Sequence, residues 1–185
     1  MPGTGQYDEL LVLGPAEIWF GTAGSERQLG AMVGGMTLNG EFMTADIKKD
    51  PYGDGPYDQV FVGTNVNIEG NLADLRFDAL ADTIPGTTLT DDGDATPTQS
   101  KLQFASPVGT NLRSIAKQLI IKPTVGGVAT ADQNKWYTFA IAAAIPTIRL
   151  AFSVTEQSVM PIRFQVFPDT TTTQVLGYKG YASPA

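Results

Sequence analysis

The chain of 185 residues contains neither cysteine nor histidine. Without cysteine, the protein has no disulfide bond, no thiolate metal ligand and no thiol nucleophile. Without histidine, it lacks the commonest general base near neutral pH and the commonest metal ligand. These two absences argue against an enzyme, and we expect no catalytic, cofactor-binding or metal-binding residue.

Basic residues are few and dispersed. Twelve Lys and Arg stand against 19 Asp and Glu, which gives a formal net charge of −7, and only Lys48 and Lys49 are adjacent. A protein that binds nucleic acid tightly concentrates basic groups to neutralise phosphates. The composition therefore argues against a tight nucleic-acid binder and predicts a surface that repels DNA.

Long apolar runs are also missing. The longest, residues 139–146, ends in proline and is far shorter than the ~20 residues of a membrane span. Residues 1–6 lack the basic start and apolar run of a secretion signal. We expect one domain over residues 1–185, with residues 1–8 flexible, that neither spans a membrane nor follows a Sec-type export route.

Alternating apolar and polar residues are the strongest structural signal. In residues 162–167, Ile162, Phe164 and Val166 alternate with Arg163, Gln165 and Phe167, and residues 147–154 alternate in the same way. A period of two is typical of strands with one buried face. Further strands are predicted at residues 16–20, 34–42, 59–62, 64–72, 102–104, 116–122, 136–142 and near 175–178.

One segment between the strands has a helical period. Leu72, Leu75, Ala79 and Leu80 fit a short amphipathic helix within residues 71–82, which Asn71 would cap. Gly63 is interpreted as a tight turn, and residues 46–57 and 83–98 as long loops. The fold class is therefore mainly β: an antiparallel β-sandwich or partly closed barrel with one short flanking α-helix and long loops.

Several motifs suggest chemistry but fit plain structural roles better. Residues 21–25 (Gly-Thr-Ala-Gly-Ser) lack the Gly-Lys-Ser/Thr of a phosphate loop, which favours a turn between strands. Two acidic clusters could hold calcium but do not have EF-hand spacing, so solvated loops are favoured. The clusters are Asp50, Asp54 and Asp58, and Asp91, Asp92 and Asp94.

A sugar-binding or sugar-cleaving role also has candidate residues. Glu156 and Asp169 lie at predicted strand ends, where glycosidase carboxylates often occur. Trp19, Trp136 and Tyr137 could stack on a sugar, although core or interface positions are favoured for such residues.

The order of turn glycines in the first half of the chain carries a resemblance. The motifs are Gly14-Pro15-Ala16-Glu17-Ile18-Trp19-Phe20-Gly21, Gly24-Ser25-Glu26, Leu29-Gly30, Gly34-Gly35-Met36-Thr37-Leu38, Asp50-Pro51-Tyr52-Gly53, Pro56-Tyr57-Asp58 and Gly63-Thr64-Asn65-Val66-Asn67-Ile68. From about Leu13 to Leu80 the chain resembles tail tube (major tail) proteins of long-tailed bacteriophages. The second half is similar only in its β character.

The resemblance implies a virion structural protein whose hexameric rings stack into a hollow tail tube that conducts DNA during ejection. Its partners would be further copies of itself, the tape measure protein, the tail terminator and the baseplate, with DNA passing without sticking. Such a protein would reside in the virion tail after assembly in the host cytoplasm. The long loop would reach a neighbouring subunit through Asp46, Lys48, Lys49, Asp50, Tyr52, Gly53, Asp54 and Tyr57.

The residues themselves are compatible with that implication. Rings can close exposed sheet edges from copy to copy, stacked contacts can propagate a filament, and an acidic wall lets phosphates slide. Two alternatives stay open: another phage structural protein, such as a decoration protein, terminator or baseplate component, and a carbohydrate-binding β-sandwich.

Overall fold

The computed structural model describes residues 15–30, 32–48, 55–73, 76–93, 99–148, 158–171 and 175–182. Over these residues the chain is mainly β, with antiparallel sheets and one short α-helix, as the sequence predicts. The strands are β1 (Ala16–Gly21), β2 (Arg27–Gln28), β3 (Met32–Ile47), β4 (Asp58–Leu72), β5 (Thr87–Asp91), β6 (Ser100–Phe104), β7 (Lys117–Val125), β8 (Val128–Ala129), β9 (Tyr137–Pro146), β10 (Met160–Val166) and β11 (Tyr178–Lys179). The α-helix is α1 (Phe77–Thr83), and two 3-10 turns are η2 (Leu112–Ile115) and η3 (Gln133–Lys135).

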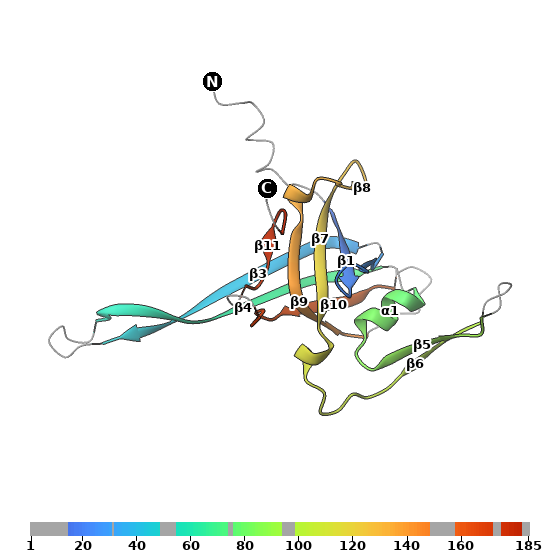
Figure 1. Cartoon of the computed structure of the whole chain (residues 1–185), viewed down its shortest axis with the longest axis horizontal. Helices are drawn as coiled ribbons and strands as arrows, with labels where there is room; N and C mark the ends of the chain where they lie inside the picture. Colours follow the sequence, from blue (N-terminus) through green and yellow to red (C-terminus); the bar gives the residue numbers. More distant parts are fainter. Residues whose placement is uncertain are drawn as a thin grey trace, which may run out of the picture.

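Nine strands form one antiparallel sheet in the order β2-β1-β7-β9-β10-β4-β3, with β8 beside β7 and β11 beside β9. The sheet curls, so that β1, β7 and β9 run across the direction of β3 and β4 (Figure 1). The two halves face each other through their apolar sides, and the rings of Phe20 and Phe164 lie 5.2 Å apart between centroids. Among the described strands no pairing joins β2 to β3, so the sheet is an open curl.

The buried core lies inside this curl. Ile162, Phe164 and Val166 of β10 are buried, and the alternation predicted for this segment is confirmed. In β4, Val66, Ile68 and Leu72 are buried as predicted. The core is completed by Ile18, Phe20, Leu29, Ala79, Leu119, Ile121, Phe139, Ala142, Ala144 and Met160.

The tight turn predicted at Gly63 is wrong. β4 runs unbroken from Asp58 to Leu72, beside β3 along almost its whole length. Met43 pairs with Gly63 and Thr44 with Phe61, which leaves Val62 as one extra residue in β4. An extra residue of this kind is a β-bulge, which bends and twists a hairpin without ending it. Glycine is permissive in backbone conformation, but the long partner strand decides that this one stays extended.

The helix starts later than its sequence pattern suggests. α1 begins at Phe77, and Asn71 is not its cap, because Asn71 continues β4 and pairs with Val33 and Pro161. The helix cap is Arg76, which makes no side-chain capping bond. Strand partners on both sides of Asn71 override the local helical period. Two other residues of the predicted helix, Asp74 and Leu75, lie outside the described residues.

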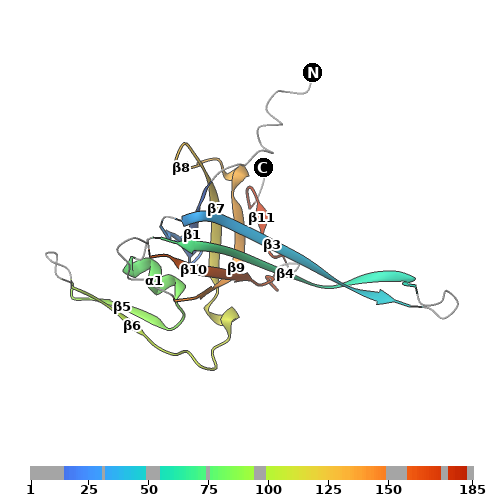
Figure 2. The ribbon, with the colours of Figure 1, turned by 180° about the vertical axis from the view of Figure 1, so that it is seen from behind.

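The long loop predicted at residues 83–98 is also wrong in its central part. Thr87–Asp91 forms β5 and pairs with Ser100–Phe104 of β6 in a separate two-stranded sheet. Its threonines favour a strand, although they give no apolar alternation. This hairpin lies beside α1, on the side of the molecule opposite the long β3–β4 hairpin (Figure 2). Residues 94–98 lie outside the described chain.

Two strand limits near the C-terminal half also differ from prediction. β9 continues beyond residue 142 to Pro146, and the strand expected from Thr147 does not include Thr147 or Ile148. Its remaining residues, 149–154, lie outside the described part of the chain. The last strand is β11 at Tyr178–Lys179, while Val175 forms an isolated bridge with Asp169.

Candidate assembly surfaces

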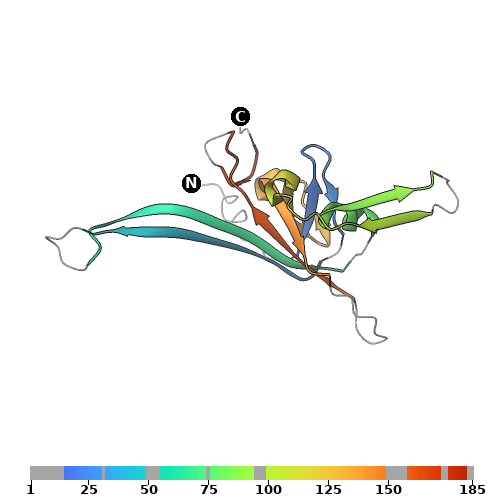
Figure 3. The same cartoon turned by 90° about the horizontal axis from the view of Figure 1, so that it is seen from below.

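The β3–β4 hairpin extends far beyond the body of the protein (Figure 3). We call its outer part the arm: residues 42–47 of β3 and residues 58–63 of β4. The long pairing of β3 with β4 positions the arm, with Asp46 opposite Gln59 near its end. A two-stranded hairpin in water is marginally stable by itself, so a projecting one gains much from further contacts.

The apolar face of the hairpin continues past the core. Side chains alternate along a strand, so Phe42 lies on the same face as Met36 and Leu38, which line the inner side of the curl. The bulge places Phe61 on that face too, and the Phe42 and Phe61 rings meet nearly edge-on at 6.3 Å between centroids. Phe42 is nevertheless 68% exposed and Phe61 73% exposed.

A groove of about 560 Å³ lies at the base of the arm. Val62, the bulge residue, is 62% exposed beside it. The groove is lined by Phe42, Met43, Phe61, Val62, Gly63, Thr64, Pro168 and Leu176. Contiguous exposed apolar groups of this kind mark interaction surfaces, because leaving them in water is unfavourable.

The structure describes only part of the predicted inter-subunit loop. Asp46 belongs to β3, where its carboxylate accepts a hydrogen bond from the Gln59 side chain at 2.8 Å. Lys48 directly follows β3, and the Tyr57 backbone N–H donates to the Ile47 carbonyl at 2.8 Å. Asp46 lies near the far end of the arm, and Lys48 and Tyr57 lie directly beyond it. The other five predicted residues, Lys49, Asp50, Tyr52, Gly53 and Asp54, lie outside the described chain.

The main sheet presents a polar face on the side away from the core. Thr37 of β3, Glu69 of β4 and Arg163 of β10 are register partners in one row across the strands. The next row is Asn39, Asn67 and Gln165. The Gln165 side-chain amide donates to Asn65 Oδ1 at 2.8 Å, so the amides link neighbouring strands.

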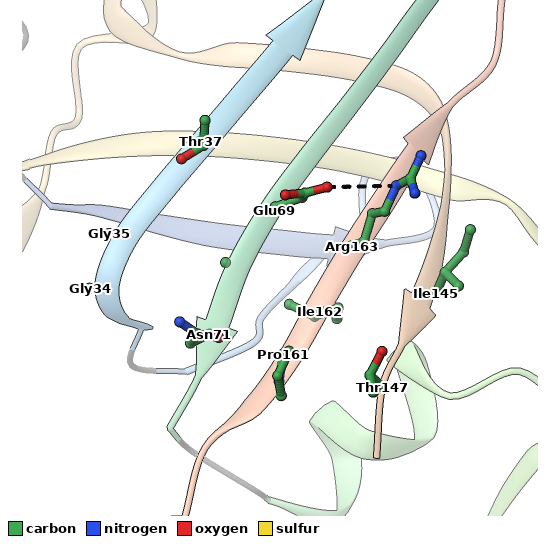
Figure 4. A pocket seen from close by; sticks show the side chains of 11 residues that line it. Gly34, Gly35, Thr37, Glu69, Asn71, Ile145, Thr147, Pro161, Ile162 and Arg163 are labelled. Atoms are coloured by element: carbon green, nitrogen blue, oxygen red, sulfur yellow. Dashed lines mark ion pairs between the residues drawn. The ribbon is translucent and has the colours of Figure 1, made fainter. Parts of the chain in front are cut away.

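This polar face is hollowed near its edge. A depression of about 420 Å³ is bordered by Gly34, Gly35, Thr37, Glu69, Gly70, Asn71, Ile145, Thr147, Pro161, Ile162 and Arg163 (Figure 4). Within it, Arg163 Nε lies 3.9 Å from Glu69 Oε1, and both side chains are well exposed. An exposed ion pair of this length contributes little stability. The face therefore offers amides and hydroxyls with a weak, partly compensated charge.

Along β3 and along part of β9, one side of the strand has no described partner strand. β3 is the last strand of the sheet, and no described strand lies on its outer side. β9 pairs with β7 only as far as Ala142, while its pairing with β10 continues to Pro146. The stretch from Ala143 to Pro146 therefore has one side without a described partner strand. An exposed edge such as that of β3 pairs readily with another chain, whereas Ala143 and Ala144 of β9 are buried in the single chain.

The three predicted sugar-stacking aromatics do not share a surface. Lys122 Nζ lies 3.7 Å from the Trp19 ring centroid and 4.1 Å from that of Trp136, so its ammonium fills the space between the two indoles. Tyr137 instead lines a cleft inside the curl. Burial lowers the pKa of Lys122, and the nearby carboxylates of Glu26 and Glu17 act in the opposite direction.

The other candidate motifs lie in turns and strand ends. Gly21 ends β1, and residues 22–25 lie in the turn to β2, where the Ser25 backbone N–H donates to the Thr22 carbonyl at 2.8 Å. Asp169 accepts from the Thr171 backbone and hydroxyl, in the manner of a turn residue. Glu156, Asp50, Asp54 and Asp94 lie outside the described residues.

Neither a cluster of metal ligands nor a membrane-spanning helix occurs in the described residues. No group of three or more Asp, Glu, His or Cys in this part of the chain could hold a metal ion. None of the helices in the described ranges is long and apolar enough to cross a membrane.

The exposure of Phe61 and Val62 on the arm is not predicted from the sequence, where both residues fall in a short strand before a turn. The signal was present in Val60-Phe61-Val62, a run of three apolar residues where a half-buried strand alternates. Both faces of such a segment need cover.

No protein-family model and no curated protein matches the chain.

Proposed function

We propose that this chain is a structural protein of a phage tail, whose copies join into hexameric rings that stack into a hollow tube for DNA. The observation that carries the proposal is the arm, where Phe42 and Phe61 continue the apolar face of the sheet beyond the core and stay mostly exposed. The resemblance of residues 13–80 to tail tube proteins supplies the kind of assembly.

The open strand edges support a ring. The free side of β3 in one copy pairs with β9 in the next copy, starting at the partly exposed Ile145 and Pro146, which have no described partner strand on that side. The repeating unit is then the four strands β3, β4, β10 and β9. Pairing around a ring removes every open edge of this unit, which is how closed barrels avoid uncontrolled association.

The dimensions of such a ring fit a duplex. Six copies contribute about 24 strands, and strands spaced by about 4.8 Å and tilted by about 40° give a backbone diameter of about 48 Å. After side chains are added, the bore still admits double-stranded DNA.

The polar face is the best candidate for the wall of the bore. Asn39, Asn67 and Gln165 offer neutral amides, Glu69 lies opposite the guanidinium of Arg163, and Glu41 adds a further carboxylate on β3. This wall has too little positive charge to hold phosphates, so DNA would slide past it. With the polar face turned toward the bore, the buried core and α1, which packs against that core, lie on the outer side of the ring.

The arm supports stacking. It projects away from the body, so it can lie against a copy in the same ring or the next, where Phe42 and Phe61 become buried. A contact that joins unlike surfaces and does not close on itself propagates a filament. Tape measure, terminator and baseplate proteins would limit the length and ends of this filament.

Electron microscopy of the purified protein over a range of concentrations tests the proposal. We expect rings and stacked tubes above a threshold concentration, or after addition of a tail initiator complex. A tail terminator, the nearest alternative, would stop at a single ring. A protein that stays monomeric at high concentration and ignores initiator complexes would refute a tube.

A further inference from the structure

The apolar face of the β3–β4 hairpin changes sides at the base of the arm. Side chains alternate along β3, so Leu38 and Phe42 lie on one face, which we call the front, and Met43, Ala45 and Ile47 lie on the other, which we call the rear. The front face is apolar as far as residue 42. From residue 43 onward, the apolar side chains of β3 lie on the rear face.

The partner strand changes sides at the same place. Thr44 pairs with Phe61 and Ala45 pairs with Val60, so Phe61 lies on the front face and Val60 on the rear face. The change coincides with the β-bulge, where Val62 is the extra residue that brings the two strands back into register. Both strands therefore expose apolar side chains on opposite faces within a few residues.

The rear face of the arm continues the polar face of the main sheet. The last polar pair on this face is Glu41 with Asn65, and the next pair along it is Met43 with Gly63. A Cβ atom added at Gly63 would lie 3.0 Å from Met43 Cε, so the glycine leaves room for the methionine side chain to lie across this face. The polar face thus becomes apolar where the arm begins.

No part of the described chain covers the rear face of the arm. Met43, Ile47 and Val60 are between 40% and 47% exposed. The front face at the level of Val60 and Ile47 is polar instead, because it carries Asp46 and Gln59, whose side chains are hydrogen-bonded to each other. The outer part of the arm is therefore an amphipathic ribbon, and its apolar side points away from the face that carries the two phenylalanines.

One face of the arm is too small to hold a neighbour. Residues 42–47 at about 3.3 Å each give a ribbon about 20 Å long, and two strands spaced by about 4.8 Å make it about 10 Å wide. Each face thus presents about 200 Å², whereas a stable interface buries about 800 Å² on each partner. Contacts on both faces double this area, and they require two surfaces on opposite sides of the ribbon.

We propose that each arm is held between two further copies of this chain. One copy covers the front face at Phe42 and Phe61, and the other covers the rear face at Ala45, Ile47 and Val60. The assignment rests on the proposed tube, in which one of these copies belongs to the same ring and the other to the adjacent ring. Every copy then supplies one arm and receives the arms of others, so unlike surfaces meet and the contact propagates.

A lipid bilayer is the other apolar partner that such a ribbon could meet. Asp58 pairs with Ile47 on the rear face, so a carboxylate lies beside the apolar side chains. The negative surface of a bilayer with anionic lipids repels this carboxylate and the net charge of −7. The charges therefore favour a protein surface.

Thiol accessibility in dispersed and assembled protein tests the rear contact. The native chain has no cysteine, so each variant carries a single thiol. Val60→Cys reports on the rear face, and Gln59→Cys reports on the front face at the same level of the arm. We expect assembly to slow the reaction of Val60→Cys with a thiol reagent by at least about tenfold, and that of Gln59→Cys by less than about threefold. Ala45→Cys repeats the rear measurement on the partner strand.

The outcomes separate this contact from tube formation. Tubes in which Val60→Cys reacts as fast as in the dispersed chain would overturn the proposal and leave the tube standing. Equal slowing of Val60→Cys and Gln59→Cys would also overturn it, because the cover would not follow the apolar side. A chain that never assembles would refute the tube and this contact together. Slowing by vesicles of phosphatidylcholine and phosphatidylserine, without assembly, would assign the rear face to a membrane.

A double substitution gives a second measurement. Ile47→Thr with Val60→Thr removes apolar groups from the rear face and keeps β-branched side chains in both strands. Because it buries two hydroxyl groups in the proposed contact, we expect the threshold concentration for assembly to rise by about tenfold or more. The control is Val108→Thr with Val128→Thr, at two exposed valines outside the arm, which should change the threshold by less than about twofold. A rear variant that assembles at the native threshold contradicts the proposal.

Discussion

The Phe42 and Phe61 rings meet nearly edge-on across the two strands of the arm, yet both remain mostly in solvent. Their contact holds the strands together locally, while most of their apolar area is left uncovered. A monomer therefore gains little from these rings compared with an assembly that buries them. Substitutions at these two rings should therefore weaken assembly more than they weaken folding.

Replacing both rings, Phe42→Ser with Phe61→Ser, should block assembly and spare the fold. Burial of each ring contributes about 1.5 kcal/mol or more, so loss of both raises the assembly threshold by about 100-fold or more. The free energy of unfolding should change by less than about 1 kcal/mol, because both side chains are exposed. Sedimentation velocity measures the first quantity and chemical denaturation the second.

Phe20→Ala is the matched control for that variant. Phe20 is fully buried against Phe164, so its truncation should cost about 3–5 kcal/mol of unfolding free energy. An arm variant that loses as much stability as Phe20→Ala would mean that the arm belongs to the folding core and is no docking element.

Deleting Val62 should straighten the arm without changing which residues pair. Thr44 already lies opposite Phe61, and removal of the extra residue leaves that pairing and its faces in place. Because bulges increase local bend and twist, the deletion redirects the arm. We expect an unchanged melting temperature and defective or absent tubes in electron micrographs. Normal tubes would show that the direction of the arm is unimportant.

Lysines on the polar face should make assembled protein bind DNA. Thr37→Lys with Asn39→Lys adds two cations per copy to the proposed wall of the bore, where the native residues are neutral. Binding of short duplexes, followed by fluorescence anisotropy, should appear and weaken steeply with salt. Thr88→Lys with Gln103→Lys adds the same charge to the β5–β6 hairpin. Equal binding by both variants would place the polar face outside the bore.

The stability of the protein should depend on Lys122 at alkaline pH. Burial lowers the pKa of this ammonium in the folded state below 10.5, so the unfolded chain holds the proton more tightly. This site therefore adds stability as pH rises from the lowered value through 10.5, and that stability is lost as pH falls. Lys122→Arg stays charged throughout. In thermal melts from pH 8 to 10.5, the melting temperature of the native chain should rise relative to that of Lys122→Arg. A difference in melting temperature that stays constant over this pH range would exclude the effect.

Side-chain alternation made much of the fold predictable. Ile162, Phe164 and Val166 alternate with polar residues and are buried, because a period of two reports which face of a strand is apolar. The same rule fails for β5, since Thr87–Asp91 contains a single large apolar residue, Leu89. Its strand character comes from pairing with β6, which a local pattern does not contain.

The surfaces were harder to predict than the core. Gly63 signals a turn in sequence, but pairing with Met43 keeps it inside a long strand. The pattern around Phe42 shows on which face the ring lies, and it does not show whether anything covers that face. Exposure depends on where the body of the protein ends, which is set by distant residues such as Phe20 and Phe164.

Hydrogen exchange of the backbone amides of β3, measured by mass spectrometry on dispersed and assembled protein, tests most directly whether copies join through the arm and the open edge. The proposal predicts rapid exchange for residues 42–47 in the dispersed state and exchange slowed by about 100-fold or more in the assembled state, with β6 amides nearly unchanged. Assemblies in which residues 42–47 exchange as fast as in the dispersed chain would contradict it.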